Sequence, residues 1–313
     1  SFYEMKIQTV SNKDYLKRYQ IKSPLIEDYT VLNSSILYEK SYENSDFTSS
    51  INVFEDLSKK SSDKYEYVLP SYVYSNENNL NTEFFDKVRF KSSGNYRKFN
   101  TNVDEADLIN DFIFTKKNQN FSNNLENDLS FLLRNINTHS NLSKKYKEDE
   151  DFKVITSALI NFKYPMIKEG NNGKSFLTPL ASLRYSPYPG INQKNQKTVI
   201  NFNDLFMLDR ISDKTVEKGL SSTLGFELKN QDILNQDKIN LGVGINFRAD
   251  NDEDLPLSSS LGNKTSDLIG YSGLNITENL SFGYDFSIKH NLSDINYSLV
   301  STKYKTDKFK TSF

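Results

Sequence analysis

The side chains that most often carry out covalent or metal chemistry are scarce in this sequence. The chain of 313 residues contains no cysteine and only two histidines, His139 and His290, which we expect to be solvated beside turns. Thiolate catalysis, thiolate metal sites and multi-histidine metal sites are therefore excluded. Neither a glycine-rich phosphate loop nor a Gly-x-Ser-x-Gly nucleophile motif occurs. We therefore expect that the chain is not an enzyme and that it needs no cofactor.

The acidic run Asp252-Glu253-Asp254 is a group of carboxylates that could bind a divalent cation. Carboxylate oxygens are the ligands that divalent cations such as Ca²⁺ prefer. Acidic runs in loops are also commonly just solvated. The sequence leaves both interpretations open.

The elements that position these residues are predicted by a strict alternation of apolar and polar side chains. From Leu280 to Lys289 the apolar residues occupy one face and the polar residues the other, and Ile239 to Phe247 alternates in the same way. This period of two predicts strands with one apolar and one polar face. Several strands keep the alternation for about nine to eleven residues, the length that a tilted strand needs to cross a bilayer.

Polar, turn-forming stretches such as Lys116–Asn120 separate roughly fifteen such strands and predict a meander of antiparallel hairpins. Only the connections Pro187–Lys218 and Ala249–Lys264 are long, and we expect both to be extracellular because periplasmic turns of outer-membrane barrels are short. Pro70 and Pro179 lie inside predicted strands and indicate an edge, a bulge or locally broken pairing. The composition does not shift along the chain, so we predict one domain over residues 1–313 without an internal boundary.

The composition combines a polar average with many aromatic side chains. The mean hydropathy is −0.65, yet 13% of the residues are aromatic, with 19 Tyr and 22 Phe. An antiparallel transmembrane β-barrel explains both values, because its polar faces line a wet lumen while its apolar faces contact lipid and carry aromatic residues at the bilayer borders. A soluble β-sandwich is the alternative for alternating strands, although its strands are usually shorter. The net charge of −2 does not favour a nucleic-acid partner.

A series of short segments, each weak alone, carries a family resemblance through its order and spacing on a β-meander. The segments are Leu180–Pro187, Ile200–Phe206, Asp209–Arg210, Val216–Leu220, Phe247–Arg248, Asp254–Pro256, Ser260–Leu261 and Thr265–Gly270. Together they resemble the C-terminal barrel domain of the lipopolysaccharide-assembly family LptD. Asp14–Tyr19 and Val68–Pro70 are similar to the early barrel strands of that family.

The resemblance implies a location and a function. It implies a Gram-negative outer-membrane barrel that receives lipopolysaccharide from periplasmic bridge proteins and inserts it into the outer leaflet through a seam between the first and last strands. The implied partners are lipopolysaccharide, an LptE-like plug lipoprotein in the lumen, the bridge proteins and the lipids of the outer membrane. Because the family barrel has about 26 strands and follows a periplasmic jellyroll, we expect this chain to be a middle-to-late part of such a barrel.

Four charged residues lie at or near strand ends in the best-matching segments: Arg184, Asp204, Arg210 and Asp267. The resemblance implies that they hold the long connections inside a lumen crossed by lipopolysaccharide, or that the arginines contact lipid phosphates. The alternative is that they are ordinary loop caps and exposed ion pairs. For Leu205–Phe206 we expect an apolar anchor that packs a loop against the barrel.

Glycines on the polar faces of the predicted strands have a structural interpretation. Gly225, Gly242, Gly244 and Gly283 are expected to relieve crowding or to allow strong strand curvature. Two other functions remain open for the whole chain, a passive porin or receptor barrel and a soluble β-rich interaction module. Dependence on detergent separates the soluble module from both membrane barrels.

Overall fold

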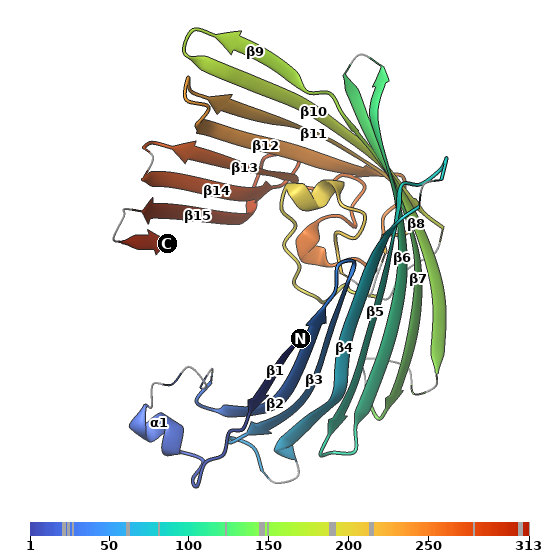
Figure 1. Cartoon of the computed structure of the whole chain (residues 1–313), viewed down its shortest axis with the longest axis vertical. Coiled ribbons are helices and arrows are strands. Elements are labelled where there is room, and N and C mark those ends of the chain that lie inside the picture. Colours follow the sequence, from blue (N-terminus) through green and yellow to red (C-terminus); the bar gives the residue numbers. More distant parts are fainter. Residues whose placement is uncertain are drawn as a thin grey trace. The chain divides into compact units, whose positions relative to one another are not determined.

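A computed structural model describes residues 1–20, 23, 26, 28–60, 63–80, 82–122, 124–143, 148, 150–187, 192–212, 216–277, 279–305 and 309–312. Sixteen strands dominate it, with one short α-helix, α1 (Tyr15–Tyr19), and two 3₁₀ turns, η2 (Asn203–Phe206) and η3 (Leu257–Ser259) (Figure 1). The strands are β1 Phe2–Lys6, β2 Val31–Ser41, β3 Ser45–Asp56, β4 Tyr65–Asn79, β5 Lys87–Phe99, β6 Asp104–Ser122, β7 Leu125–Asn141, β8 Asp151–Lys163, β9 Met166–Gly170, β10 Gly173–Ser186, β11 Gly219–Gln231, β12 Asp237–Arg248, β13 Leu268–Asn275, β14 Leu280–Ile288, β15 Ile295–Lys305 and β16 Lys310–Ser312.

The strands follow one another in an antiparallel meander. The sheet order begins at β1, ends at β16 and follows the sequence, except that β9 lies off the path and pairs with β10. This open, all-β sheet confirms the predicted fold class, a partial barrel of hairpins. The chain forms two compact units, unit 1 (Ser1–Phe114 and Leu133–Val154) and unit 2 (Thr115–Leu132 and Ile155–Phe313).

In unit 2 the strands have one covered face and one open face. On β12, Asn246 and Arg248 are buried, whereas Ile239 and Phe247 on the other side are 40% and 37% exposed. The covered face is the one against which residues 192–212 and 249–267 pack, and it carries the polar residues of the alternation. The open face carries the apolar residues, as the period of two predicted.

The two prolines inside strands each mark a local break in pairing. In β4 the register shifts between Val68 and Ser71, on either side of Pro70, in the pairing with β5. In β10, Pro179 pairs with Phe226 of β11 on one side, while on the other side the pairing with β9 ends at Leu177 and that with β8 begins at Leu180. Since proline has no amide hydrogen, it is tolerated where a ladder hydrogen bond is missing.

Three local predictions are wrong. Asp14–Tyr19 does not form a strand, because Tyr15–Tyr19 is the helix α1, whose Leu16 packs in a small apolar cluster with Leu32 and Leu57. The polar stretch Lys116–Asn120 is not a turn but part of β6. His139 lies within β7 rather than beside a turn, although its side chain is exposed as expected. No helix in the described part of the chain is long and apolar enough to cross a membrane.

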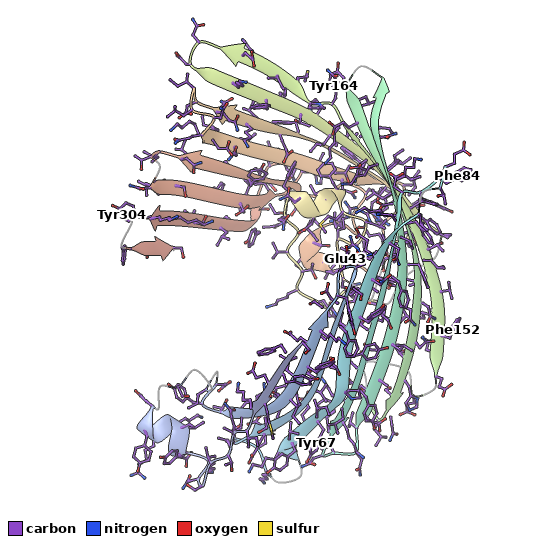
Figure 2. All side chains as sticks on the ribbon, viewed as in Figure 1. Glu43, Tyr67, Phe84, Phe152, Tyr164 and Tyr304 are labelled. Atoms are coloured by element: carbon purple, nitrogen blue, oxygen red, sulfur yellow. The ribbon has the colours of Figure 1, made fainter. Side chains whose placement is uncertain are left out.

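Unit 1 shows exposed aromatic side chains and one buried ion pair. Phe84 and Phe152 are 73% and 69% exposed (Figure 2). Arg134 donates two hydrogen bonds to Asp111, from Nε to Oδ1 at 2.7 Å and from Nη2 to Oδ2 at 2.8 Å, and both side chains are buried. A buried pair with two parallel hydrogen bonds has the geometry that best offsets the cost of removing both charges from water.

Candidate functional site

The connection between β10 and β11 is anchored on the covered face of unit 2 by apolar side chains. Leu205 of η2 is completely buried, and Phe202 is 2% exposed. These side chains belong to a cluster that also contains Ile200 of the same connection, Leu180 of β10, Ile269 of β13, and Leu255 and Leu261 of the connection between β12 and β13. The Leu205–Phe206 segment is therefore the apolar anchor that the sequence predicted.

Glycines make room for this anchor. A Cβ atom at Gly244 would lie 2.9 Å from Leu205 Cδ1, and one at Gly225 would lie 3.0 Å from Phe206 Cζ. A Cβ atom at Gly242 would collide with the ring of Tyr271 and approach Phe202 at 3.0 Å. The predicted relief of crowding is thus explained at these three positions, since each lacks a side chain where the connection reaches the sheet.

The two long connections also bind each other. The Thr198 amide donates to Ser258 Oγ at 2.9 Å, and Ser258 Oγ donates to the Thr198 carbonyl oxygen at 3.0 Å. The Gln193 amide donates to the Asp254 carbonyl oxygen at 2.7 Å. The connections therefore form one layer over the strands, and Figure 1 shows η2 and η3 beside the strands of unit 2.

Charged residues under this layer form what we call the buried charge cluster: Arg184, Arg210, Glu217, Arg248 and Asp252. At its centre, Arg210 donates from Nε to Glu217 Oε1 and from Nη2 to Glu217 Oε2 at 2.7 Å. Arg210 Nη1 also donates to the Leu205 carbonyl oxygen at 2.8 Å, and Nη2 donates to Asn246 Oδ1 at 2.9 Å. One guanidinium thus joins the apolar anchor, the end of the connection and strand β12.

The other two arginines come from strands and also bind the connections. Arg248 of β12 donates from Nη1 to Glu217 Oε2 at 3.0 Å and from Nη2 to the Lys218 carbonyl oxygen. Arg184 of β10 lies 3.9 Å from Glu217 Oε1 through its Nε, and it donates to the carbonyl oxygens of Met207 and Leu208. Three arginines therefore meet at the Glu217 carboxylate.

The electrostatics of Glu217 follow from this arrangement. Burial alone would raise the pKa of its carboxyl group, but the charges of Arg210 and Arg184, with the hydrogen bond from Arg210, lower the pKa to about 2. Glu217 is therefore ionised at every physiological pH. The carboxylate balances part of the positive charge that three buried arginines bring together, so that the connections stay bound to the covered face.

The four predicted residues do not all meet. Arg184 and Arg210 are joined by Glu217, whereas Asp204 lies in the first turn of η2 and exchanges hydrogen bonds with Asn201, from the Asp204 amide at 3.1 Å and from the Asn201 amide at 3.0 Å. Asp267 is buried elsewhere and accepts hydrogen bonds from Ser287 Oγ at 2.8 Å and Asn296 Nδ2 at 2.7 Å. The loop-cap interpretation describes Asp204. The exposed-ion-pair interpretation is wrong for Arg184 and Arg210, whose side chains are 3% and 1% exposed.

Sequence reasoning did not single out Glu217, Arg248 or Asp252 as members of this site. Glu217 and Arg248 lie in segments that carry the family resemblance, and Asp252 lies in the acidic run. The sequence could not identify them because it does not show that they are buried. A charged residue in a polar connection looks the same whether it is buried or exposed. Asp252 Oδ2 accepts from the Lys218 amide at 3.0 Å and from Arg248 Nη2 at 3.5 Å, so the solvated interpretation is wrong for Asp252.

The cation interpretation of the acidic run finds no supporting geometry. Within the described ranges, no group of three or more His, Cys, Asp and Glu side chains is placed to hold a metal ion. The carboxylate of Asp252 instead neutralises Arg248 and binds the backbone. The arrangement serves to hold two connections against a sheet, which is a mechanical task.

A comparison with protein families agrees with the resemblance. The profile of the family described as "LptD: LPS transport system D" matches residues 2–312. Among solved structures, the alcaligin outer membrane receptor FauA from Bordetella pertussis is similar with a TM-score of 0.36 and 10% identity, over 89% of this chain and 57% of that chain. The chain thus spans little more than half the length of that receptor. The comparison with curated proteins found no match.

Proposed function

The chain belongs to the LptD family of lipopolysaccharide transport proteins, and from this premise we propose that it forms part of an outer-membrane barrel that moves lipopolysaccharide to the outer leaflet. In this proposal it receives the lipid from periplasmic bridge proteins and releases it through the lumen and a lateral seam. An LptE-like lipoprotein occupies the lumen. The chain makes and breaks no covalent bond, and the energy comes from elsewhere.

The observation that carries the proposal is the family match over residues 2–312. The faces of unit 2 support it. Leu183, Tyr185 and Leu224 on the open face are 46%, 53% and 52% exposed, which suits contact with lipid chains. A polar covered face suits the hydrated saccharide, since sugar and phosphate groups need hydrogen-bonding partners when they leave bulk water.

The buried charge cluster has a role in this proposal. The long connections lie on the wall of the transport path and must not move into the path. The cluster holds them against that wall while the lipid passes. Glu217 is the central group because it accepts from Arg210 and Arg248. The cluster therefore positions the path and does not itself need to contact the lipid.

Depletion of the protein in its Gram-negative host tests the proposal. We expect surface lipopolysaccharide to fall and the lipid to accumulate internally, because the exit is missing. Wild-type protein and the Glu253→Gln variant, which changes an exposed carboxylate beside the cluster, restore the surface lipid. Normal surface lipopolysaccharide after depletion would contradict the proposal and favour a passive porin or receptor barrel.

Purification tests the membrane location separately. We expect the chain to require detergent and to copurify with a lipoprotein. A chain that stays monodisperse in plain buffer would contradict every membrane function, because apolar open faces of this extent would then need another cover.

A further inference from the structure

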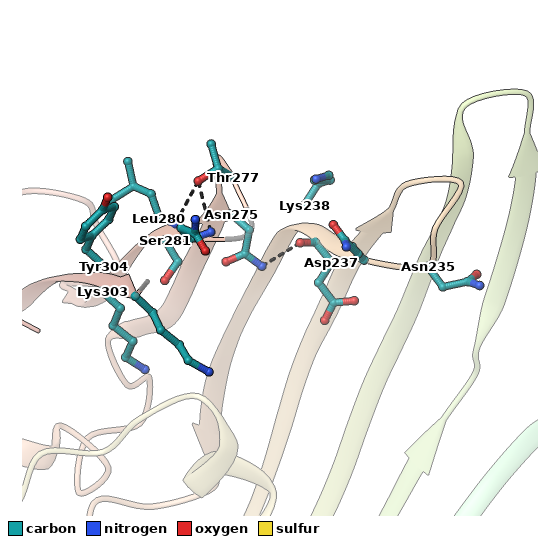
Figure 3. A pocket seen from close by; sticks show the side chains of 12 residues that line it. Asn235, Asp237, Lys238, Asn275, Thr277, Leu280, Ser281, Lys303 and Tyr304 are labelled. Carbon is teal, nitrogen blue, oxygen red and sulfur yellow. Dashed lines mark hydrogen bonds between the residues drawn. The ribbon is translucent and has the colours of Figure 1, made fainter. Parts of the chain in front are cut away.

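The end of unit 2 that lies opposite the long connections contains an open cavity. It has a volume of about 670 Å³ and is formed by the turns that join β11 to β12 and β13 to β14, together with the end of β15 (Figure 3). Lys238, Lys303 and Lys305 line it, with Asp237 as the carboxylate among the described lining residues. The cavity therefore has an excess of positive charge.

The charges in this cavity differ in how they are neutralised. Asp237 accepts from Lys229 Nζ at 2.9 Å and from Gln231 Nε2 at 2.8 Å, neither of which lines the cavity. Lys238 is paired with Asp232 at 3.1 Å. For Lys303 and Lys305, no carboxylate among the described residues lies within ion-pair distance of Nζ. Within the residues that the structure describes, both ammonium groups are thus left to a ligand.

Neutral donors accompany the two lysines. The Ser281 hydroxyl has no hydrogen-bond partner in the described part of the chain, and Ser281 lies directly opposite Lys303 in the β14–β15 pairing. Thr277 Oγ1 accepts from the amides of Asn279 at 3.2 Å and Leu280 at 3.1 Å, which leaves its own proton free to donate. Ammonium and hydroxyl donors around a space of this size suit the oxygens of a phosphate monoester.

The position of the cavity relates it to the covered face. Ser281 and Ser287 lie on the same side of β14, because they are six residues apart in a strand with a period of two. Ser287 Oγ donates to Asp267, which borders the connection between β12 and β13. Lys303 and Lys305 therefore lie on the covered face, at the end where the turns are short.

We propose that Lys303 and Lys305, with the Ser281 hydroxyl, bind a phosphate monoester at the short-turn end of the covered face. The proposed transport function is needed only to name the source, a phosphorylated saccharide lipid that meets these two lysines before it reaches the long connections. Ammonium groups attract phosphate as point charges and exchange it readily, which suits a site that a lipid passes.

Binding to the full chain in detergent tests the site. The probes are lipopolysaccharide with intact saccharide phosphates, the same lipid after enzymatic dephosphorylation, and inorganic phosphate. We expect Lys303→Gln/Lys305→Gln to weaken binding of the phosphorylated lipid at least tenfold and Lys303→Arg/Lys305→Arg to retain it. The matched control, Lys264→Gln/Lys289→Gln, removes the same charge near the other end of the strands and should bind as the wild type.

Each alternative outcome overturns the proposal. Unchanged affinity in the Lys303→Gln/Lys305→Gln variant, or an equal loss in the control, would show that these lysines form no specific site. Equal binding of the dephosphorylated lipid would show that the site does not recognise the phosphate group. If inorganic phosphate alone bound as tightly as the lipid, the source would be free phosphate and not a headgroup. Surface lipopolysaccharide after depletion is measured independently of these binding results. Failure of the site and failure of the transport function therefore remain distinguishable.

Discussion

The two ends of the covered face of unit 2 use charge in opposite ways. At the end with long connections, Arg184, Arg210 and Arg248 are buried around Glu217 and bind its carboxylate and nearby backbone carbonyl oxygens. At the end with short turns, Lys303 and Lys305 have no carboxylate partner among the described residues. Charges that are neutralised internally stabilise the protein, whereas charges that are left unpaired are available to a ligand. The following changes test this difference, from the largest expected effect to the smallest.

Glu217→Gln should have the largest effect on stability. It keeps the shape of the side chain but leaves three buried arginines without their common carboxylate, and breaking a buried pair by neutralising one partner costs about 3–5 kcal/mol. The unfolding free energy in detergent, measured by denaturant titration, should fall by that amount. The exposed neighbour variant Glu253→Gln should match the wild type, and equal stability of both variants would contradict a structural role of the cluster.

Acidification should have a comparable effect that depends on Glu217. The pKa of Glu217 is about 2 in the folded protein and 4.5 for an unperturbed glutamate, the value expected in the unfolded chain. Its contribution to the unfolding free energy is therefore complete above about pH 4.5 and is lost as the pH falls towards 2. The stability difference between wild type and Glu217→Gln should therefore be constant from pH 7 to 5 and shrink below pH 4.5. A difference that stays constant down to pH 3 while the protein remains folded would show that the carboxylate is not buried as described.

Gly244→Ala should destabilise the anchor moderately. The added methyl group would lie 2.9 Å from Leu205 Cδ1 and 3.4 Å from the backbone oxygen of Leu224, and overpacking of this kind costs about 1–3 kcal/mol. Faster proteolysis of residues 192–212 should accompany the loss. Gly283→Ala is the control, because its methyl group would meet only the Ser301 side chain, whose hydroxyl can rotate away. Equal effects of the two changes would argue against a specific fit of the connection.

Lys289→Gln should have the smallest effect. Lys289 Nζ lies 2.6 Å from Asp294 Oδ2, and the hydrogen bond from Lys289 lowers the pKa of Asp294. Both side chains are 45% or more exposed, so water replaces the pair at little cost. We expect an unchanged unfolding midpoint. A loss as large as that of Glu217→Gln would remove the distinction between buried and exposed charges.

The period of two predicted most of the fold, and long-range pairing explains what it could not predict. The alternation from Ile239 to Phe247 fixed β12 and its two faces, and the absence of strand patterns between Pro187 and Lys218 fixed the first long connection. The sequence does not reveal the role of Glu217, because its burial depends on Arg248, which lies 31 residues away on a strand, as well as on the nearer Arg210. The helix α1 was not predicted, because its burial depends on Leu32 and Leu57, which are distant in sequence.

Cross-linking tests the central claim, that the long connection between β10 and β11 lies on the covered face. The chain has no native cysteine, so engineered pairs report without background. Leu205→Cys removes the Cδ1 atom that a side chain at position 244 would meet, so Leu205→Cys with Gly244→Cys should link efficiently through a short thiol cross-linker. The link should weaken when Glu217→Gln is added. Leu205→Cys with Ile245→Cys, one residue further and on the open face, should not link. Equal linking of both pairs, or of neither, would contradict the account.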